Sequence, residues 1–98
     1  MIVTLHPEAE EDVAEAAAFY EQTGSPALAA RFVAEFKRAA QVVLANPGIG
    51  TPRPRGRFFF PFRRVFPYGL IYFAHDDGIH VLVVRRDRRR PSFGTGRK

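Results

Sequence analysis

The sequence predicts an α+β domain with the element order β-α-α-β-β-β, in which a helical hairpin packs on one face of a mainly antiparallel sheet. Two observations lead to this prediction. Apolar residues recur at helical spacing between residues 7 and 45, and apolar runs separated by Gly, Pro and Asp follow between residues 57 and 86. Helices followed by strands are typical of α+β proteins. Because 98 residues leave room for one core, we expect a single domain over 1–98.

The N-terminal quarter predicts a short strand, Ile2–Leu5, and then a first helix. Pro7 suits the first helical position because it has no N–H to leave unpaired there. Acidic residues follow in the first turns, where the helix dipole favours negative charge. Apolar residues at helical spacing extend this helix to about Gln22, and we expect Gly24 to end it.

A second, longer helix follows almost at once. Ser25 is placed to cap it, with Pro26 at its first position, and Asn46-Pro47-Gly48 ends it. Its apolar stripe consists of Leu28, Phe32, Phe36, Ala39 or Ala40, and Val43. So short a link predicts that the two helices form an antiparallel hairpin.

The C-terminal half supplies the rest of the sheet. Residues 48–56 are rich in Gly and Pro and predict a loop, Asp76-Asp77-Gly78 predicts a hairpin turn, and residues 87–98 form a basic tail. The strands are expected at 57–66, as one strand or as two pieces (57–60 and 62–66) interrupted at Pro61, and at 69–75 and 79–86. With the helices on one face of this sheet, the opposite face is free to carry arginines.

Charge is strongly divided along the chain, which has a net charge of +5 and a pI of about 10.4. Residues 1–52 hold three basic and seven acidic residues, whereas residues 53–98 hold twelve basic and three acidic ones. This division indicates a surface for an anionic partner, either nucleic acid or an acidic protein segment. A solubilising surface is the alternative, but it would not need arginine so strongly over lysine.

Period-two geometry predicts that one of Arg63 and Arg64, and one of Arg85 and Arg86, lie on the open face of the sheet. Together with the tail they would form a phosphate-binding saddle. The candidate target- or nucleic-acid-binding residues are Arg57, Arg63, Arg64, Arg85, Arg86, Arg88, Arg89, Arg90 and Arg97.

Aromatic residues alternate with these arginines, and most of them are expected in the core. Consecutive residues of a strand point to opposite faces, and Phe58, Phe59 and Phe60 are consecutive. At least one of these rings must therefore face outward or meet a partner. Such a ring suits base stacking, or contact with a protein partner.

Several classes of function have no support in the sequence. There is no cysteine, which excludes disulfides and thiolate chemistry, and His6, His75 and His80 show no metal-ligand spacing, so we expect no metal and no cofactor. No apolar run is long enough to span a bilayer, and the start of the chain does not read as a signal peptide. We therefore expect a cytoplasmic protein without membrane contact.

The order and spacing of several short motifs resemble the RelE/ParE toxin superfamily of bacterial type II toxin–antitoxin systems, most closely its ParE-like, plasmid-stabilisation branch. The resemblance spans nearly the whole chain. Its motifs are His6-Pro7-Glu8-Ala9, Phe19-Tyr20, Ser25-Pro26 with Arg31-Phe32, Asn46-Pro47, residues 66–72 (FPYGLIY), residues 81–84 (VLVV) and Arg88-Arg89-Arg90-Pro91.

The resemblance implies a cytosolic toxin that arrests growth and is neutralised by a cognate antitoxin protein, for which Phe58–Phe60 is a candidate groove. Operator DNA would be bound only through the antitoxin complex. ParE-type members inhibit DNA gyrase, and RelE-type members cleave mRNA on the ribosome. Cleavage would need a proton acceptor, a proton donor and positive charge on the phosphate.

Compared with the ribonuclease branch, this chain keeps Arg64 and Arg89 at positions that would contact phosphate. At the other reacting positions it departs from that pattern. Lysines are replaced by Phe60 and Phe62, an arginine by Gly69, a histidine by Arg86 and a C-terminal tyrosine by Phe93. These departures favour a gyrase inhibitor over an enzyme.

Two alternatives stay open. One is a ribosome-dependent endoribonuclease that uses Arg64 and Arg89 for charge and Tyr68, Tyr72 or His75 as an unusual base. The other is a non-toxic module that still binds antitoxin and DNA.

Overall fold

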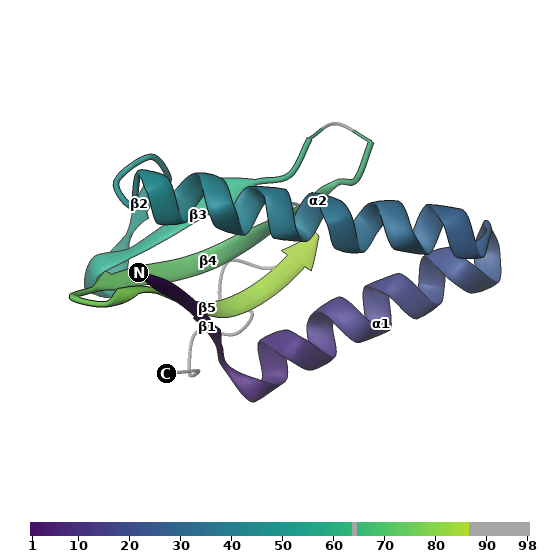
Figure 1. Ribbon diagram of the computed structural model, residues 1–98, viewed down its shortest axis with the longest axis horizontal. Helices are drawn as coiled ribbons and strands as arrows, with labels where there is room; N and C mark the ends of the chain where they lie inside the picture. Colours follow the sequence, from purple (N-terminus) through teal and green to yellow (C-terminus); the bar gives the residue numbers. More distant parts are fainter. Residues whose placement is uncertain (64, 87–98) are drawn as a thin grey trace.

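The computed structural model describes residues 1–63 and 65–86, and it has two helices on one face of a five-stranded sheet (Figure 1). The elements are β1 (Ile2–Leu5), α1 (Pro7–Thr23), α2 (Pro26–Ala45), β2 (Thr51–Arg53), β3 (Arg57–Pro61), β4 (Tyr68–His75) and β5 (Gly78–Arg86). The strands lie in the order β1-β5-β4-β3-β2. Strand β1 is parallel to β5, which the helical hairpin between them allows, and all other pairs are antiparallel. The predicted α+β class is confirmed.

Both helices begin with side-chain caps. His6 Nδ1 accepts a hydrogen bond from Glu8 N at 3.1 Å, and Ser25 Oγ accepts one from Leu28 N at 3.0 Å. Gly24 ends α1 as predicted, but with φ −133° it is not left-handed. A Cβ there would lie 2.7 Å from Leu28 Cδ2 and 2.9 Å from Tyr20 O, so the tight link between the helices requires glycine for space.

Two predictions about the region between α2 and β4 are wrong. The segment expected as a loop contains β2, an edge strand in which Pro52 is tolerated, and a 3₁₀ turn (Pro54–Gly56) that reverses the chain into β3. Of the second expected strand piece, residues 62, 63, 65 and 66 are not in a strand. Phe62 N still donates to Tyr68 O at 2.8 Å, but Phe66 N then donates back to Arg63 O at 3.0 Å, which turns the chain.

The core lies between the sheet and the helices and is largely aromatic. Phe32 of α2 is fully buried, and its ring centroid lies 5.0–5.7 Å from those of four other rings. These rings belong to Tyr20, Phe62, Phe66 and Tyr68. Because Phe62 and Phe66 both turn inward, the segment between β3 and β4 packs against the helices instead of extending the sheet.

Candidate functional site

Strand alternation assigns the three consecutive phenylalanines of β3 to different faces. Phe58 pairs with Tyr72 and Phe60 with Leu70, and all four pack in or against the core. Phe59 pairs with Ile71 and therefore points to the other face of the sheet, away from the helices, which we call the outer face. The prediction that one of these rings faces outward is confirmed, and Phe59 is that ring, although all three phenylalanines are half-buried.

Phe59 is the centre of a cationic and aromatic cluster on the outer face. The guanidinium carbons of Arg53 and Arg85 lie 5.4 and 5.3 Å from its ring centroid, within the range of cation–π attraction. Gly69 of the neighbouring strand lies beneath the ring, because a Cβ there would approach Phe59 Cζ to 2.4 Å. Absence of a side chain at position 69 therefore lets the ring lie between the two arginines.

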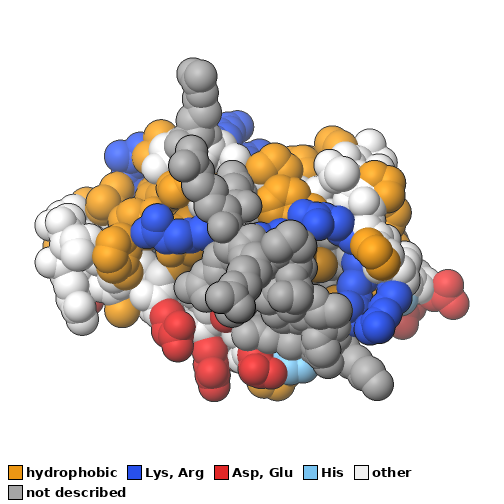
Figure 2. Space-filling model, turned by 180° about the vertical axis from the view of Figure 1, so that it is seen from behind, with side chains coloured by type: hydrophobic (Ala, Val, Ile, Leu, Met, Phe, Trp, Pro, Cys, Tyr) orange, Lys and Arg blue, Asp and Glu red, His pale blue; other side chains and the backbone are white. Residues whose placement is uncertain are grey.

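Strand pairing adds a third cation to this cluster. Arg53 of β2 lies directly opposite Arg57 of β3, on the same face as Phe59. Like charges directly opposite in an antiparallel pair repel each other, so positive charge is concentrated at this end of the sheet. Figure 2 shows Lys and Arg side chains among hydrophobic ones on the outer face, with Asp and Glu along its lower edge. We call Arg53, Arg57, Phe59 and Arg85 the outer cluster.

Arg85 and Arg86 have different surroundings. Arg85 is only 3% exposed, and its Nη1 donates to Arg86 O at 3.3 Å, so it supports Phe59 more than it meets solvent. Arg86 is exposed at the end of β5, with its guanidinium carbon 5.5 Å from the ring centroids of both Phe19 and Tyr68. Arg86 thus bridges the end of the sheet and the exposed ring on α1.

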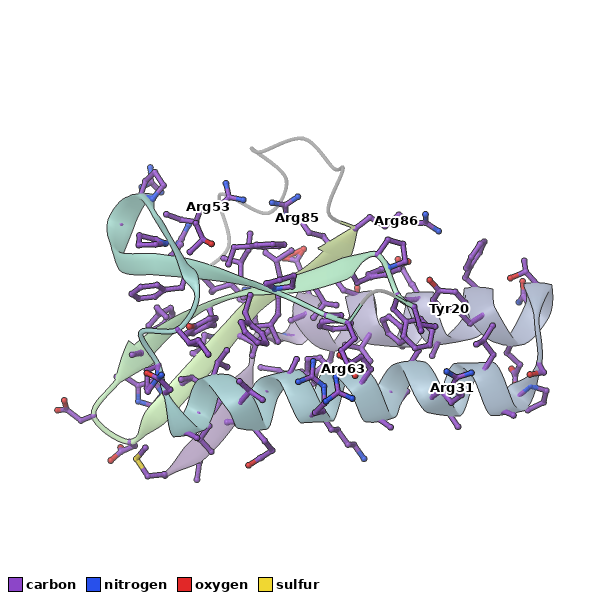
Figure 3. The ribbon with its side chains drawn as sticks, turned by 90° about the horizontal axis from the view of Figure 1, so that it is seen from above. Tyr20, Arg31, Arg53, Arg63, Arg85 and Arg86 are labelled. Atoms are coloured by element: carbon purple, nitrogen blue, oxygen red, sulfur yellow. The ribbon has the colours of Figure 1, made fainter. Side chains whose placement is uncertain are left out.

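Arg63 is not part of the outer cluster. Its backbone N donates to Glu35 Oε2 of α2 at 2.9 Å. Figure 3 shows Arg63 and Arg31 beside α2, whereas Arg53 and Arg85 lie on the other side of the sheet and Arg86 lies at the end of β5. The remaining predicted arginines, together with Phe93 and the rest of the tail, lie outside the described residues: Arg64, Arg88, Arg89, Arg90 and Arg97.

Tyr68, Tyr72 and His75 were suggested as unusual bases. The two tyrosines are part of the core, and His75 lies far from Arg86 along the sheet. Tyr72 is fully buried; its hydroxyl donates to Pro47 O at 2.7 Å and accepts from Gly50 N at 3.1 Å, and burial raises its pKa. Tyr68 is in the aromatic core. His75 pairs with Gly78, at the opposite end of β4 from Tyr68 and Arg86, which is roughly 23 Å at about 3.3 Å per residue.

Neither a metal-binding cluster of side chains nor a helix suited to crossing a membrane occurs in the part of the chain that the structure describes. Within 1–63 and 65–86 there is no group of three His, Asp or Glu side chains that could hold a metal ion. In the same residues no helix is long and apolar enough to cross a bilayer.

The sequence analysis missed two groups of arginines, one in the outer cluster and one on α2. Arg53 was not among the candidate binding residues, because its segment read as a loop; the Thr51-Pro52-Arg53 run before a Gly/Pro turn is the only signal that could have placed it. Arg31 and Arg38, on α2, were not considered as a site either. Their spacing to Glu35 of four and three residues places all three side chains on one side of the helix.

Comparisons with known proteins agree with this architecture. A family model described as the ParE toxin of the type II toxin–antitoxin system parDE matches residues 3–91. A solved chain from the chromosomal ParDE TA system from P. aeruginosa has a similar fold, with a TM-score of 0.75 and 19% sequence identity. The similarity covers 88% of this chain and 95% of that chain. No curated protein matches the sequence.

Proposed function

This chain belongs to the ParE toxin family of type II toxin–antitoxin systems, and on that premise we propose that it inhibits DNA gyrase by binding through the outer cluster. A cognate antitoxin protein neutralises it, and growth arrest follows when the toxin is in excess. It acts in the cytoplasm as a single domain over residues 1–98. We expect Arg64 and the tail arginines Arg88, Arg89, Arg90 and Arg97 to contribute to target binding through their charge.

The observation that carries this proposal is the position of Arg53 directly across from Arg57, on the same face of the sheet as an outward aromatic ring. Positive charge and a ring on a rigid sheet suit a partner that presents phosphates or carboxylates together with apolar surface. Gyrase in complex with DNA presents both. Arg85 keeps the Phe59 ring in place, and Arg57 and Arg53, which are half-buried, supply the contacts.

The same geometry disfavours RNA cleavage at the outer cluster. Arginine can stabilise a phosphate charge but stays protonated, so a separate group has to accept the proton of the attacking 2′-hydroxyl. Tyr68 and Tyr72 face the helices, and His75 lies at the far end of β4, so none of these three adjoins Arg85 on the outer face. Binding without cleavage is the function that this arrangement supports best.

Two assays on the purified full chain test the proposal. The expected result is that the toxin inhibits supercoiling by gyrase in a dose-dependent way, and that excess antitoxin restores it. In cells that express the toxin alone, total mRNA is expected to stay intact. Normal supercoiling at saturating toxin, or rapid cleavage of transcripts within reading frames, would overturn the proposal and favour the ribonuclease alternative. Unimpaired growth without antitoxin would favour a non-toxic module.

A further inference from the structure

A second cationic surface lies on the opposite side of the molecule from the outer cluster. A surface pocket of about 390 Å³ opens between α2 and the segment that joins β3 to β4. Its lining includes Arg31, Glu35 and Arg38 of α2, and Arg63, Val65 and Phe66 of the segment. We call this the α2 pocket. Figure 3 shows Arg31 and Arg63 beside α2, away from the arginines of the sheet.

The one carboxylate in the α2 pocket is already engaged by the protein. Glu35 Oε1 accepts a hydrogen bond from Arg38 Nε at 2.9 Å, and Oε2 accepts one from Arg63 N at 2.9 Å. The Glu35 side chain is only 10% exposed, and the hydrogen bond from Arg38 lowers its pKa, so it stays ionised. With three guanidinium groups against one carboxylate, the pocket keeps a net positive charge of two.

Glu35 also fixes the shape of the pocket. It holds Arg38 against α2 and anchors the backbone of the joining segment at Arg63, while the Arg31 and Arg63 side chains remain exposed. Beside them, Val65 is 59% exposed, although its neighbour Phe66 is buried in the core. Arginine is enriched in protein interfaces, and the exposed Val65 side chain offers apolar surface for a partner to bury.

We propose that the α2 pocket docks an acidic peptide segment of a partner protein. One carboxylate of that segment binds Arg31 and Arg63, and a neighbouring apolar side chain packs on Val65. Nucleic acid fits less well, because repeated phosphates need a track of cations, whereas this pocket offers a compact cluster with an apolar wall and a carboxylate at its base. The inference concerns a different surface from the outer cluster and does not depend on the target of the toxin.

The test measures binding to the full chain by fluorescence anisotropy at low salt. The probes are a short labelled peptide in which glutamates flank a leucine, the same peptide with glutamines, and a labelled single-stranded oligonucleotide. The glutamate peptide is expected to bind about tenfold more tightly than the glutamine peptide, because charge complementarity supplies the contacts to arginine. Arg31→Gln and Arg63→Gln should each weaken its binding roughly fivefold.

Lys37→Gln is the matched control, because Lys37 is exposed on the same helix, lies outside the pocket lining and carries the same charge. Its effect should stay within about twofold, as should that of Arg53→Gln/Arg57→Gln on the outer face. The inference is overturned if the glutamine peptide binds equally well, if Lys37→Gln weakens binding as much as Arg31→Gln, or if the glutamate peptide does not bind. Oligonucleotide binding that depends on Arg31 and Arg63 would also overturn it. None of these outcomes bears on gyrase inhibition.

Discussion

Tyr72 connects the end of α2 to the sheet, and its replacement by phenylalanine separates a structural role from a catalytic one. The hydroxyl satisfies the carbonyl of Pro47 and the amide of Gly50, which is itself buried, in the turn that leads into β2. Removal of the hydroxyl leaves both groups without that partner, at a cost of about 1–3 kcal/mol for each group that water cannot reach. Because only Gly50 of these two residues is buried, we expect Tyr72→Phe to lower the free energy of unfolding by roughly 1–3 kcal/mol.

The assay is equilibrium urea unfolding, with Tyr68→Phe as the control on the same strand and the same face. The folded Tyr72→Phe protein should inhibit gyrase as the wild type does, because the hydroxyl that the substitution removes faces the core and not the partner. Burial raises the pKa of Tyr72 in the folded protein above its ordinary value of 10.0. The stability that the protonated hydroxyl contributes is therefore fully present below pH 10.0 and is lost as pH rises through the folded pKa. Tyr72→Phe should lack this loss of stability at high pH. Unchanged stability together with lost activity would refute the structural role.

Three further predictions concern single side chains. Glu35→Gln should cost about 1 kcal/mol at neutral pH. Because the folded pKa of Glu35 lies below 4.5, this difference from the wild type should shrink as pH falls through that pKa, and a difference that persists at pH 2 would contradict it. Gly69→Ala should displace the Phe59 ring and weaken gyrase inhibition, whereas Gly48→Ala, where a Cβ meets nothing within 4 Å, should be neutral in the same supercoiling assay; equal effects would disprove the contact. Phe32→Ala should lower the free energy of unfolding by about 3–5 kcal/mol in urea titrations, and a loss below 1 kcal/mol would contradict its central place in the core.

The helices and the main hairpin were predictable because each has a local signal. Ser25 and Pro26 mark the start of α2 by chemistry that acts within one turn, and the Asp76-Asp77-Gly78 turn fixes how β4 meets β5. The outward position of one ring among Phe58–Phe60 follows from period-two geometry alone, since three consecutive residues of a strand cannot share a face.

The elements that were missed depend on tertiary contacts. Residues 62–66 have the composition of a strand, but Phe62 and Phe66 are both buried against Phe32. The hydrogen bond from Phe66 N to Arg63 O accompanies this inward packing. Strand β2 is only three residues long and contains a proline, so its pairing with β3 has no local signature.

The sequence predicted that a cationic surface exists, but it did not predict which arginines form it. An excess of arginine in the C-terminal half indicated a cationic face, and Arg57 and Arg85 do lie on it. Arg63 does not lie on this face, because β3 ends at Pro61. Arg86, the neighbour of Arg85, packs instead on the rings of Phe19 and Tyr68. Contact between these positions could be recognised only in the folded chain.

Charge on the outer face is the central feature of the proposed function, and a supercoiling assay with two charge-matched double variants tests it most directly. Arg53→Gln/Arg57→Gln removes the opposed pair, and Arg31→Gln/Lys37→Gln removes two exposed charges on α2, away from the outer face. The first variant should need about tenfold or more toxin for half-inhibition of gyrase, and the second should match the wild type within about twofold. Equal inhibition by both variants would contradict the assignment of the outer cluster as the gyrase-binding surface.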